Sequence, residues 1–160
     1  MALLILETSI KAPLIVVFDL SRSIDLHMLS TTDTHEKAIA GVTSGLIKLH
    51  ETVKWKAKHL GIYQTLTVRI TQMKEPYFFE DKMIQGIFEF MEHQHIFEEI
   101  NDEVVMKDIF QFRAPWGILG RLAEWMFLKR YMKRFLEERN TVIKEVAESG
   151  KWRNFLSYPF

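Results

Sequence analysis

Apolar and polar residues alternate one for one through the middle of the chain, which is the pattern of β-strands with one buried and one solvated face. In residues 51–59, Val53, Trp55 and Ala57 share one face and lysines occupy the other. The alternation continues in four further segments, which short polar or glycine-containing turns separate: residues 62–73, 77–84, 88–99 and 104–112. These turns are too short for crossover helices, so we expect the strands to form an antiparallel sheet.

The two ends of the chain follow other patterns. Residues 3–10 are aliphatic and β-branched and predict a first strand, and Pro13 then begins two short helices that end near Leu29. Residues 36–40 predict a further short strand, which brings the sheet to about seven strands. Residues 117–150 carry apolar side chains at helical spacing and predict one helix of roughly 32 residues, about 48 Å long. The pattern predicts an α+β fold in which a curved antiparallel sheet wraps round a long carboxy-terminal helix.

Residues 151–160 form a short aromatic tail after the predicted helix, with Trp152, Phe155, Tyr158 and Phe160. No linker divides residues 1–150, so we expect one domain there. The tail is expected to pack on that domain, to contact a partner or to be disordered.

Composition excludes several classes of protein. The 160 residues include 21 basic and 21 acidic side chains, and this balance argues against the cationic field that non-specific binding to nucleic acid requires. The chain has no cysteine, so disulfides, thiolate catalysis and cysteine-based metal sites are excluded. No apolar run approaches the ~20 residues of a membrane span, and the apolar start meets Glu7 without the basic region of a signal peptide. A cytoplasmic location is the default expectation.

The order of strand, two short helices, antiparallel strands and long helix resembles the SRPBCC superfamily, the helix-grip fold of START-like and Bet v 1-like proteins. The resemblance covers residues 3–150 and extends to a bacterial subgroup described as cyclase/dehydrase-like or ligand-binding. It rests on residues 10–13 with Val17 and Phe18, and on residues 55–59, 79–81, 93–97, 114–120 and 130–134. It implies an apolar cavity between sheet and long helix. It does not imply one chemistry, because members include lipid carriers, hormone receptors and cyclases.

Alternation also assigns the inward face of each strand. Strand by strand, the expected inward side chains are Glu51, Val53, Trp55 and Ala57; Phe79, Asp81 and Met83; and Met106, Asp108, Phe110 and Phe112. Glu80 and Lys82 are expected in solvent. Residues 88–99 are ambiguous, because both faces carry apolar residues and a one-residue shift in register exchanges them. The resemblance favours the inward face with Met91, His93, His95 and Phe97.

Five of these side chains are titratable and would share the concave side of the sheet with aromatic residues: Glu51, Asp81, His93, His95 and Asp108. A carboxylate on an apolar wall is costly unless it is paired, and histidine is its natural partner. Three interpretations stay open: a hydrogen-bond network that fixes the sheet, polar anchoring of an apolar ligand, and acid–base catalysis or a metal site.

The histidines give a weak metal signal. His93 and His95 on one strand face suit a metal only if another strand adds a third ligand, so we predict no metal. The four other histidines lie in short helix, turn or strand-end positions and are expected in solvent: His27, His35, His50 and His59.

Residues and resemblance together predict a non-catalytic binding protein without a cofactor. It would hold a small or medium hydrophobic molecule, lipid-like or polycyclic, in the cavity. The predicted ligand-binding residues are Trp55, Phe79, Asp81, Met83, Met91, His93, His95, Met106, Asp108, Phe110, Leu122 and Met126. A first alternative is a polyketide cyclase/dehydratase-like enzyme, with an acid–base cluster made of His93, His95, Asp81 and Asp108.

A second alternative is an interaction or lipid-associated protein that uses the aromatic tail or the basic run at residues 129–134. A solvated helix face, balanced by Glu137 and Glu138, is the favoured explanation of that run, so membrane contact is not the leading expectation. Nucleic acid is not expected as a partner, and both a monomer and a homodimer are compatible with the sequence.

Overall fold

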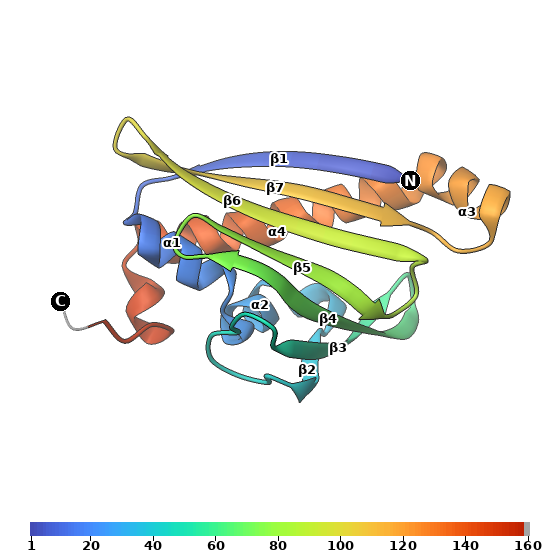
Figure 1. Ribbon diagram of the computed structural model, residues 1–160, viewed down its shortest axis with the longest axis horizontal. Helices are drawn as coiled ribbons and strands as arrows, with labels where there is room; N and C mark the ends of the chain where they lie inside the picture. The colour runs from blue at the N-terminus through green and yellow to red at the C-terminus, as the bar shows by residue number, and fades with distance from the viewer. Residues whose placement is uncertain (159–160) are drawn as a thin grey trace.

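A seven-stranded antiparallel sheet curves round a long carboxy-terminal helix in the computed structural model, which describes residues 1–158 (Figure 1). The strand order is β1-β7-β6-β5-β4-β3-β2, so β1 pairs with β7 and all other neighbours are consecutive in the chain. The strands are β1 Ala2–Ile10, β2 Lys37–Gly41, β3 Thr52–His59, β4 Ile62–Lys74, β5 Phe78–Gln85, β6 Phe90–Ile100 and β7 Glu103–Arg113. The predicted α+β helix-grip architecture is confirmed.

The register of the central strands decides which side chains reach the concave face. Asp81 of β5 lies opposite His93 of β6, and His93 and His95 lie opposite Phe110 and Asp108 of β7. Along β6 and β7 every second side chain is buried against the interior. This confirms the predicted inward face of β6, which carries Met91, His93, His95 and Phe97.

The convex face of β5 differs from the prediction at Glu80. The sequence predicts a solvated carboxylate, but Glu80 is only 1 % exposed. Thr71 Oγ1 donates to Glu80 at 2.7 Å, Gln94 Nε2 donates at 3.0 Å, and Lys82 Nζ lies 3.2 Å away. Burial alone would raise the pKa of Glu80, but these donors and the ammonium outweigh it and lower the pKa. Polar neighbours on the convex face therefore stabilise the ionised Glu80 carboxylate in place of solvent.

Two short helices follow β1, as predicted: α1 Leu14–Ser21 and α2 Ile24–Ser30, with the 3-10 turn η1 Thr32–Thr34 after them. Ser23 caps α2 by accepting a hydrogen bond from the Leu26 N–H at 3.2 Å. Phe18 of α1 packs edge-on against Phe79 and Phe97, with ring centroids 5.7 and 5.4 Å apart. Side chains of α1 therefore fill one end of the space between sheet and long helix.

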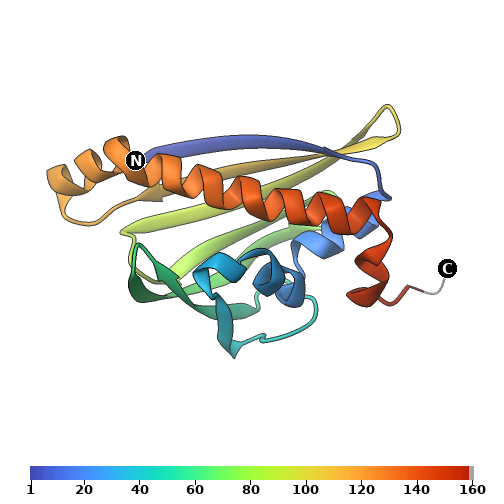
Figure 2. The same ribbon diagram turned by 180° about the vertical axis from the view of Figure 1, so that it is seen from behind.

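The long helix runs from Gly117 to Glu148 and contains one π-helical turn. It consists of α3 Gly117–Ala123, the π-turn η2 Glu124–Leu128 and α4 Lys129–Glu148. α4 lies along the concave side of the sheet (Figure 2) and buries an apolar stripe with Leu136, Ile143 and Val146. α3 extends past the end of the sheet in both views (Figures 1 and 2). None of the helices described in residues 1–158 is long and apolar enough to cross a membrane.

The described part of the tail packs on the domain. Residues Lys151–Asn154 form the 3-10 turn η3, and Trp152 and Leu156 are buried. The Tyr158 hydroxyl donates to the Asp19 carboxylate of α1. Of the three predicted roles for the tail, packing applies to residues 151–158, whereas Phe160 lies outside the described residues.

Candidate functional site

A cavity of about 200 Å³ lies between the sheet and the long helix, at the end that α1 leaves unfilled. Strands β3 to β7 supply one wall, α2 and its flanks a second, and η2 and α4 the third. Seven of the predicted ligand-binding residues line it: Trp55, Phe79, Asp81, Met91, His93, His95 and Phe110. Residues outside the predicted ligand-binding set complete the helical wall, namely Leu128, Tyr131, Met132, Phe135, Leu136 and Arg139.

Five predicted wall residues do not line the cavity. Leu122 and Met126 are 50 % and 64 % exposed, because they stand on the part of the helix that extends past the sheet. Met106 is fully buried under α1, where the Ser21 hydroxyl contacts its sulfur at 3.3 Å. Met83 is partly buried beside the core, and Asp108 lies behind the cavity-lining histidines.

The expected inward position of Glu51 is also corrected. Glu51 precedes β3 and does not line the cavity. Its carboxylate instead accepts a hydrogen bond from the Lys48 backbone N–H at 2.8 Å, which closes the preceding turn.

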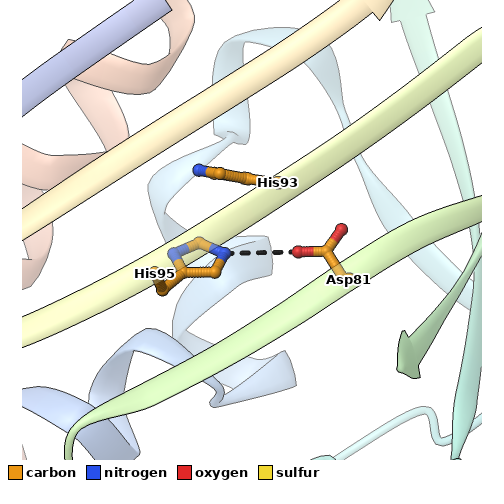
Figure 3. A group of neighbouring side chains, drawn as sticks. All are labelled: Asp81, His93 and His95. Atoms are coloured by element: carbon orange, nitrogen blue, oxygen red, sulfur yellow. Dashed lines mark hydrogen bonds and ion pairs between the residues drawn. The ribbon is translucent and has the colours of Figure 1, made fainter. Parts of the chain in front are cut away.

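Polar side chains with little exposure gather on one side of the cavity, and we call them the inner polar cluster. Asp81, His93, His95 and Arg139 line the cavity, and Asp108 and Asn140 lie behind them. Figure 3 shows His93 and His95 projecting from the same strand, with His95 facing Asp81. His95 Nε2 lies 3.2 Å from Asp81 Oδ2, and His93 Nε2 lies 2.9 Å from Asp108 Oδ1. Both imidazoles donate, because an ionised carboxylate can only accept.

Asp108 is the centre of this cluster and is fully buried. Besides His93, it accepts a hydrogen bond from Asn140 Nδ2 at 2.6 Å, and Arg139 Nη1 lies 3.6 Å away. His95 Nδ1 lies 3.0 Å from the same carboxylate but is not aligned for a hydrogen bond. Arg139 also donates to the Ser21 carbonyl at 3.0 Å, which ties the cluster to the end of α1.

The cluster keeps its carboxylates ionised and His93 neutral. Burial and the nearby His95 lower the pKa of His93 to about 4, against the opposing effect of Asp108. Burial would raise the pKa of Asp108, but contacts with His93 and His95 lower it well below its ordinary value. The pKa of Asp81 is lowered in the same way, with burial opposed by His95, His93 and Arg139. At neutral pH the cavity therefore has an anionic patch compensated by the Arg139 guanidinium.

A second group, the outer polar cluster, consists of His27, Glu36, His59 and Tyr131. His27 Nε2 donates to Glu36 Oε2 at 3.1 Å, and the His59 Nδ1 and Tyr131 hydroxyl atoms are 2.8 Å apart. All four residues line the cavity. Burial lowers the pKa of His59, while the pKa of Glu36 is lowered by His27 and His59 despite its own burial.

The outer polar cluster corrects the prediction of solvated histidines. His27 packs against Trp55 with ring centroids 4.3 Å apart and the rings tilted by 34°, and His59 contacts α4 through Tyr131. His35 and His50 are exposed, as predicted. No periodic signal identifies His27 and His59 as buried, because the members of this cluster come from α2, the segment before β2, the end of β3 and α4.

Asp81, His93 and His95 also meet the first requirement of a metal site. One ligand atom of each lies within 4.8 Å of those of the others, and Asp81 supplies the third ligand from the neighbouring strand. Two imidazoles and a carboxylate suit zinc or iron. His93 Nε2, His95 Nε2 and Asp81 Oδ2 already take part in hydrogen bonds within the cluster, however, so the absence of a metal stays our prediction.

Comparison with known proteins gives structural but no sequence matches. No family model matches the chain, and neither does any curated protein sequence. A protein of Thermus thermophilus superposes with a TM-score of 0.76 at 13 % identity, covering 93 % of this chain and 99 % of the other. A START superfamily protein from Mycobacterium smegmatis gives a TM-score of 0.69 at 9 % identity, with coverage of 92 % and 97 %.

A third protein of similar structure comes from a plant. The major latex-like protein 151 of Panax ginseng gives a TM-score of 0.66 at 15 % identity and covers 91 % of this chain and 97 % of its own. Identities this low show the fold alone. The chain therefore has the helix-grip fold that START superfamily and Bet v 1-like proteins share.

Proposed function

We propose that the protein binds a small or medium hydrophobic molecule, lipid-like or polycyclic, in the cavity between sheet and long helix, without catalysis. The observation that supports this most is the cavity of about 200 Å³, whose wall is mainly aromatic and aliphatic and most of whose ionisable groups belong to the two clusters. Apolar burial supplies affinity in such a site, and a few polar groups set the orientation.

The size and polarity of the cavity limit which ligands can fit. Pockets for drug-sized ligands measure roughly 300–1,000 Å³, so this cavity favours a compact molecule or one segment of a longer one. The inner polar cluster would orient a ligand group that donates a hydrogen bond, such as a hydroxyl, because the Asp81 carboxylate accepts and the Nε2–H of each histidine is already donated to a carboxylate. A ligand carboxylate is disfavoured there, because the cavity wall already carries the ionised Asp81 and the ionised Asp108 lies directly behind the histidines.

A second candidate is an acid–base enzyme of the polyketide cyclase/dehydratase type. In its favour, two histidines with carboxylate partners line the cavity. Against it, the pKa of His93 is lowered to about 4, whereas an efficient general base has a pKa near the working pH. Each His–Asp pair is also part of a closed network with Arg139 and Asn140, which stabilises one arrangement. We therefore rank binding first.

Native mass spectrometry of protein purified from its own host, followed by lipid and metabolite extraction, tests the proposal. Binding predicts a retained apolar molecule in a 1:1 complex that dissociates on denaturation. Protein that retains nothing and does not take up an apolar fluorescent probe would contradict it. Ligand-free protein that converts an aromatic polyketide surrogate would instead favour the enzyme, and His95→Gln should then abolish turnover.

A further inference from the structure

The helical segment that extends past the sheet displays an unusual number of large apolar side chains to solvent. Trp116, Ile118 and Trp125 are 82 %, 80 % and 81 % exposed. The other large apolar side chains of residues 116–127 are 45–71 % exposed: Leu119, Leu122, Met126 and Phe127. Contiguous apolar surface of this kind marks an interaction site, because single exposed apolar residues are common but clusters are not.

This helical segment is held in place by contacts with the rest of the fold, and these contacts keep its apolar side chains exposed. The buried Glu124 accepts a hydrogen bond from the Ala114 N–H at 2.6 Å and lies 3.2 Å from the amino-terminal ammonium. Gly120 packs so closely on the preceding loop that a Cβ there would lie 2.0 Å from the Pro115 carbonyl oxygen. These contacts fix the inner side of the segment and leave its apolar side outward.

The apolar surface continues round the mouth of the cavity. Leu60, in the β3–β4 turn, and Ile87, between β5 and β6, line the cavity and are still 57 % and 41 % exposed. Their neighbours Ile62, Tyr63 and Ile84 are 52–65 % exposed. Both views place these two turns and α3 at the same end of the molecule (Figures 1 and 2). We call the exposed residues of α3 and η2, together with these five, the apolar rim.

Positive charge accompanies the apolar rim although the whole chain is neutral. Arg121, Lys129 and Arg130 are exposed and form no ion pair with any residue in the described range 1–158. Lys133 and Arg134 follow one turn later, where Glu137 and Glu138 pair with them. The single acidic residue between positions 116 and 134 is Glu124, which is buried.

We propose that the apolar rim docks on the surface of an anionic lipid bilayer, so that the cavity takes up its ligand from the membrane. This rests on the proposed binding function, and it specifies where the ligand comes from. Tryptophan favours the boundary between headgroups and acyl chains, and cations beside an inserted apolar face add attraction to anionic lipids. The contact is peripheral: side chains enter the interface, and no helix in the described residues spans it.

A second copy of the chain fits this surface less well. In a two-fold dimer the same patch faces itself. The unpaired Arg121, Lys129 and Arg130 of both copies would then come together, with no described acidic side chain exposed between positions 116 and 134 to neutralise them. Anionic headgroups provide the neutralising charge that a second copy lacks.

Vesicle binding monitored by tryptophan fluorescence tests the proposal. Trp55 and Trp152 are buried, so a shift in emission on adding vesicles reports mainly on the exposed Trp116 and Trp125. We expect a blue shift and co-sedimentation with phosphatidylcholine vesicles that contain about 30 % phosphatidylserine, and much weaker binding without the anionic lipid. The double variant Trp116→Ala/Trp125→Ala lacks the reporting tryptophans, and in co-sedimentation it should bind at least about tenfold more weakly. Lys129→Gln/Arg130→Gln should lose the preference for anionic vesicles.

The matched control is Tyr77→Ala/Ile100→Ala, which removes two side chains that are 50 % and 46 % exposed beside turns at the opposite end of the sheet. It should bind vesicles as the wild type does. Failure of the wild type to bind, or equal binding to neutral vesicles, would overturn the proposal. A concentration-dependent dimer that Trp116→Ala/Trp125→Ala disrupts would assign the rim to a second copy instead. Uptake of a soluble apolar probe without vesicles separates these outcomes from failure of the binding function, and the tryptophan variant should retain it.

Discussion

The inner and outer polar clusters line the same cavity, but they differ in how they are built. The inner polar cluster stands on three adjacent strands and one helix turn, and its central residue, Asp108, is fully buried and has four polar neighbours. The outer polar cluster joins a short helix, a strand-flanking residue, a strand end and the long helix through two separate contacts. The first is a connected network and the second is two pairs.

This difference predicts different roles. Removing one member of a connected, desolvated network leaves other charges unpaired, whereas water can reach His27, whose side chain is 21 % exposed. We therefore expect the inner polar cluster to control stability and its pH dependence. The outer polar cluster should contribute less to the free energy of unfolding and more to the shape of the cavity.

The largest effect should follow Asp108→Asn. The substitution keeps the shape but leaves Arg139 without its buried carboxylate, so we expect a loss of about 3 kcal/mol in the free energy of unfolding measured in urea. Glu7→Gln, which breaks an exposed 3.2 Å pair between β1 and Lys107 of β7, the neighbour of Asp108, is the control and should change this free energy by less than about 0.5 kcal/mol. Equal effects of the two substitutions would refute the distinction between network and surface pair.

Stability should fall as the pH drops from 6.5 to 4. The pKa of His93 is about 4 in the folded protein and 6.5 in the unfolded chain. Between these two pH values His93 binds a proton in the unfolded state but not in the folded state, so protonation stabilises the unfolded state. The full shift corresponds to about 3 kcal/mol. Burial lowers the pKa of His59 too, which adds a loss of the same sign.

Urea unfolding at several pH values measures this slope. His93→Gln keeps a donor for Asp108 and should remove most of the decline, and His35→Gln, at an exposed position, should leave it intact. A wild type whose stability is constant between pH 6.5 and 4 would contradict the neutral, buried His93.

A smaller effect is expected at Glu36→Gln. The Glu36 carboxylate is buried, but its partner is the single side chain of His27 and not a network. The free energy of unfolding should therefore fall by about 1–2 kcal/mol, less than for Asp108→Asn. Thermal and urea unfolding of both variants give the ranking. If Glu36→Gln is the more destabilising of the two, the outer polar cluster is the structural network after all.

The smallest effect is expected from added metal. Because His93 Nε2, His95 Nε2 and Asp81 Oδ2 already take part in the network, we expect stoichiometric zinc to raise the unfolding temperature by less than about 2 °C. Elemental analysis of the purified protein provides the second measurement. A 1:1 content of a transition metal, lost in His95→Gln, would replace the hydrogen-bond network with a metal centre.

Alternation along strands predicted much of this architecture but not all of the site. It placed Asp81 and Asp108 on the concave face because strand side chains have a strict period of two. For His93 and His95 the two faces were equally apolar, and only the fold resemblance selected one. Leu122 and Met126 were misplaced because helical spacing says which side chains share a face, not whether the sheet reaches that far.

Arg139 and Asn140 were missed for a different reason, since both are polar residues in a charged helix. A usable signal was present: with Leu136, Ile143 and Val146 they share the buried face at spacings of three and four. Polar residues inside an apolar stripe point to a buried network. No such signal exists for His59 and Tyr131, whose contact depends on how the helix crosses the sheet.

Filling the cavity tests the central claim most directly. Ala57 is 3 % exposed and lines the cavity from β3, whereas its neighbour Lys56 points to the exposed face of the same strand. Ala57→Phe should occupy the space of a ligand and weaken binding of an apolar fluorescent probe at least about tenfold, because the added ring displaces the apolar contact that supplies affinity. Lys56→Phe should bind the probe as the wild type does. Undiminished binding by a folded Ala57→Phe variant would contradict a ligand site between sheet and long helix.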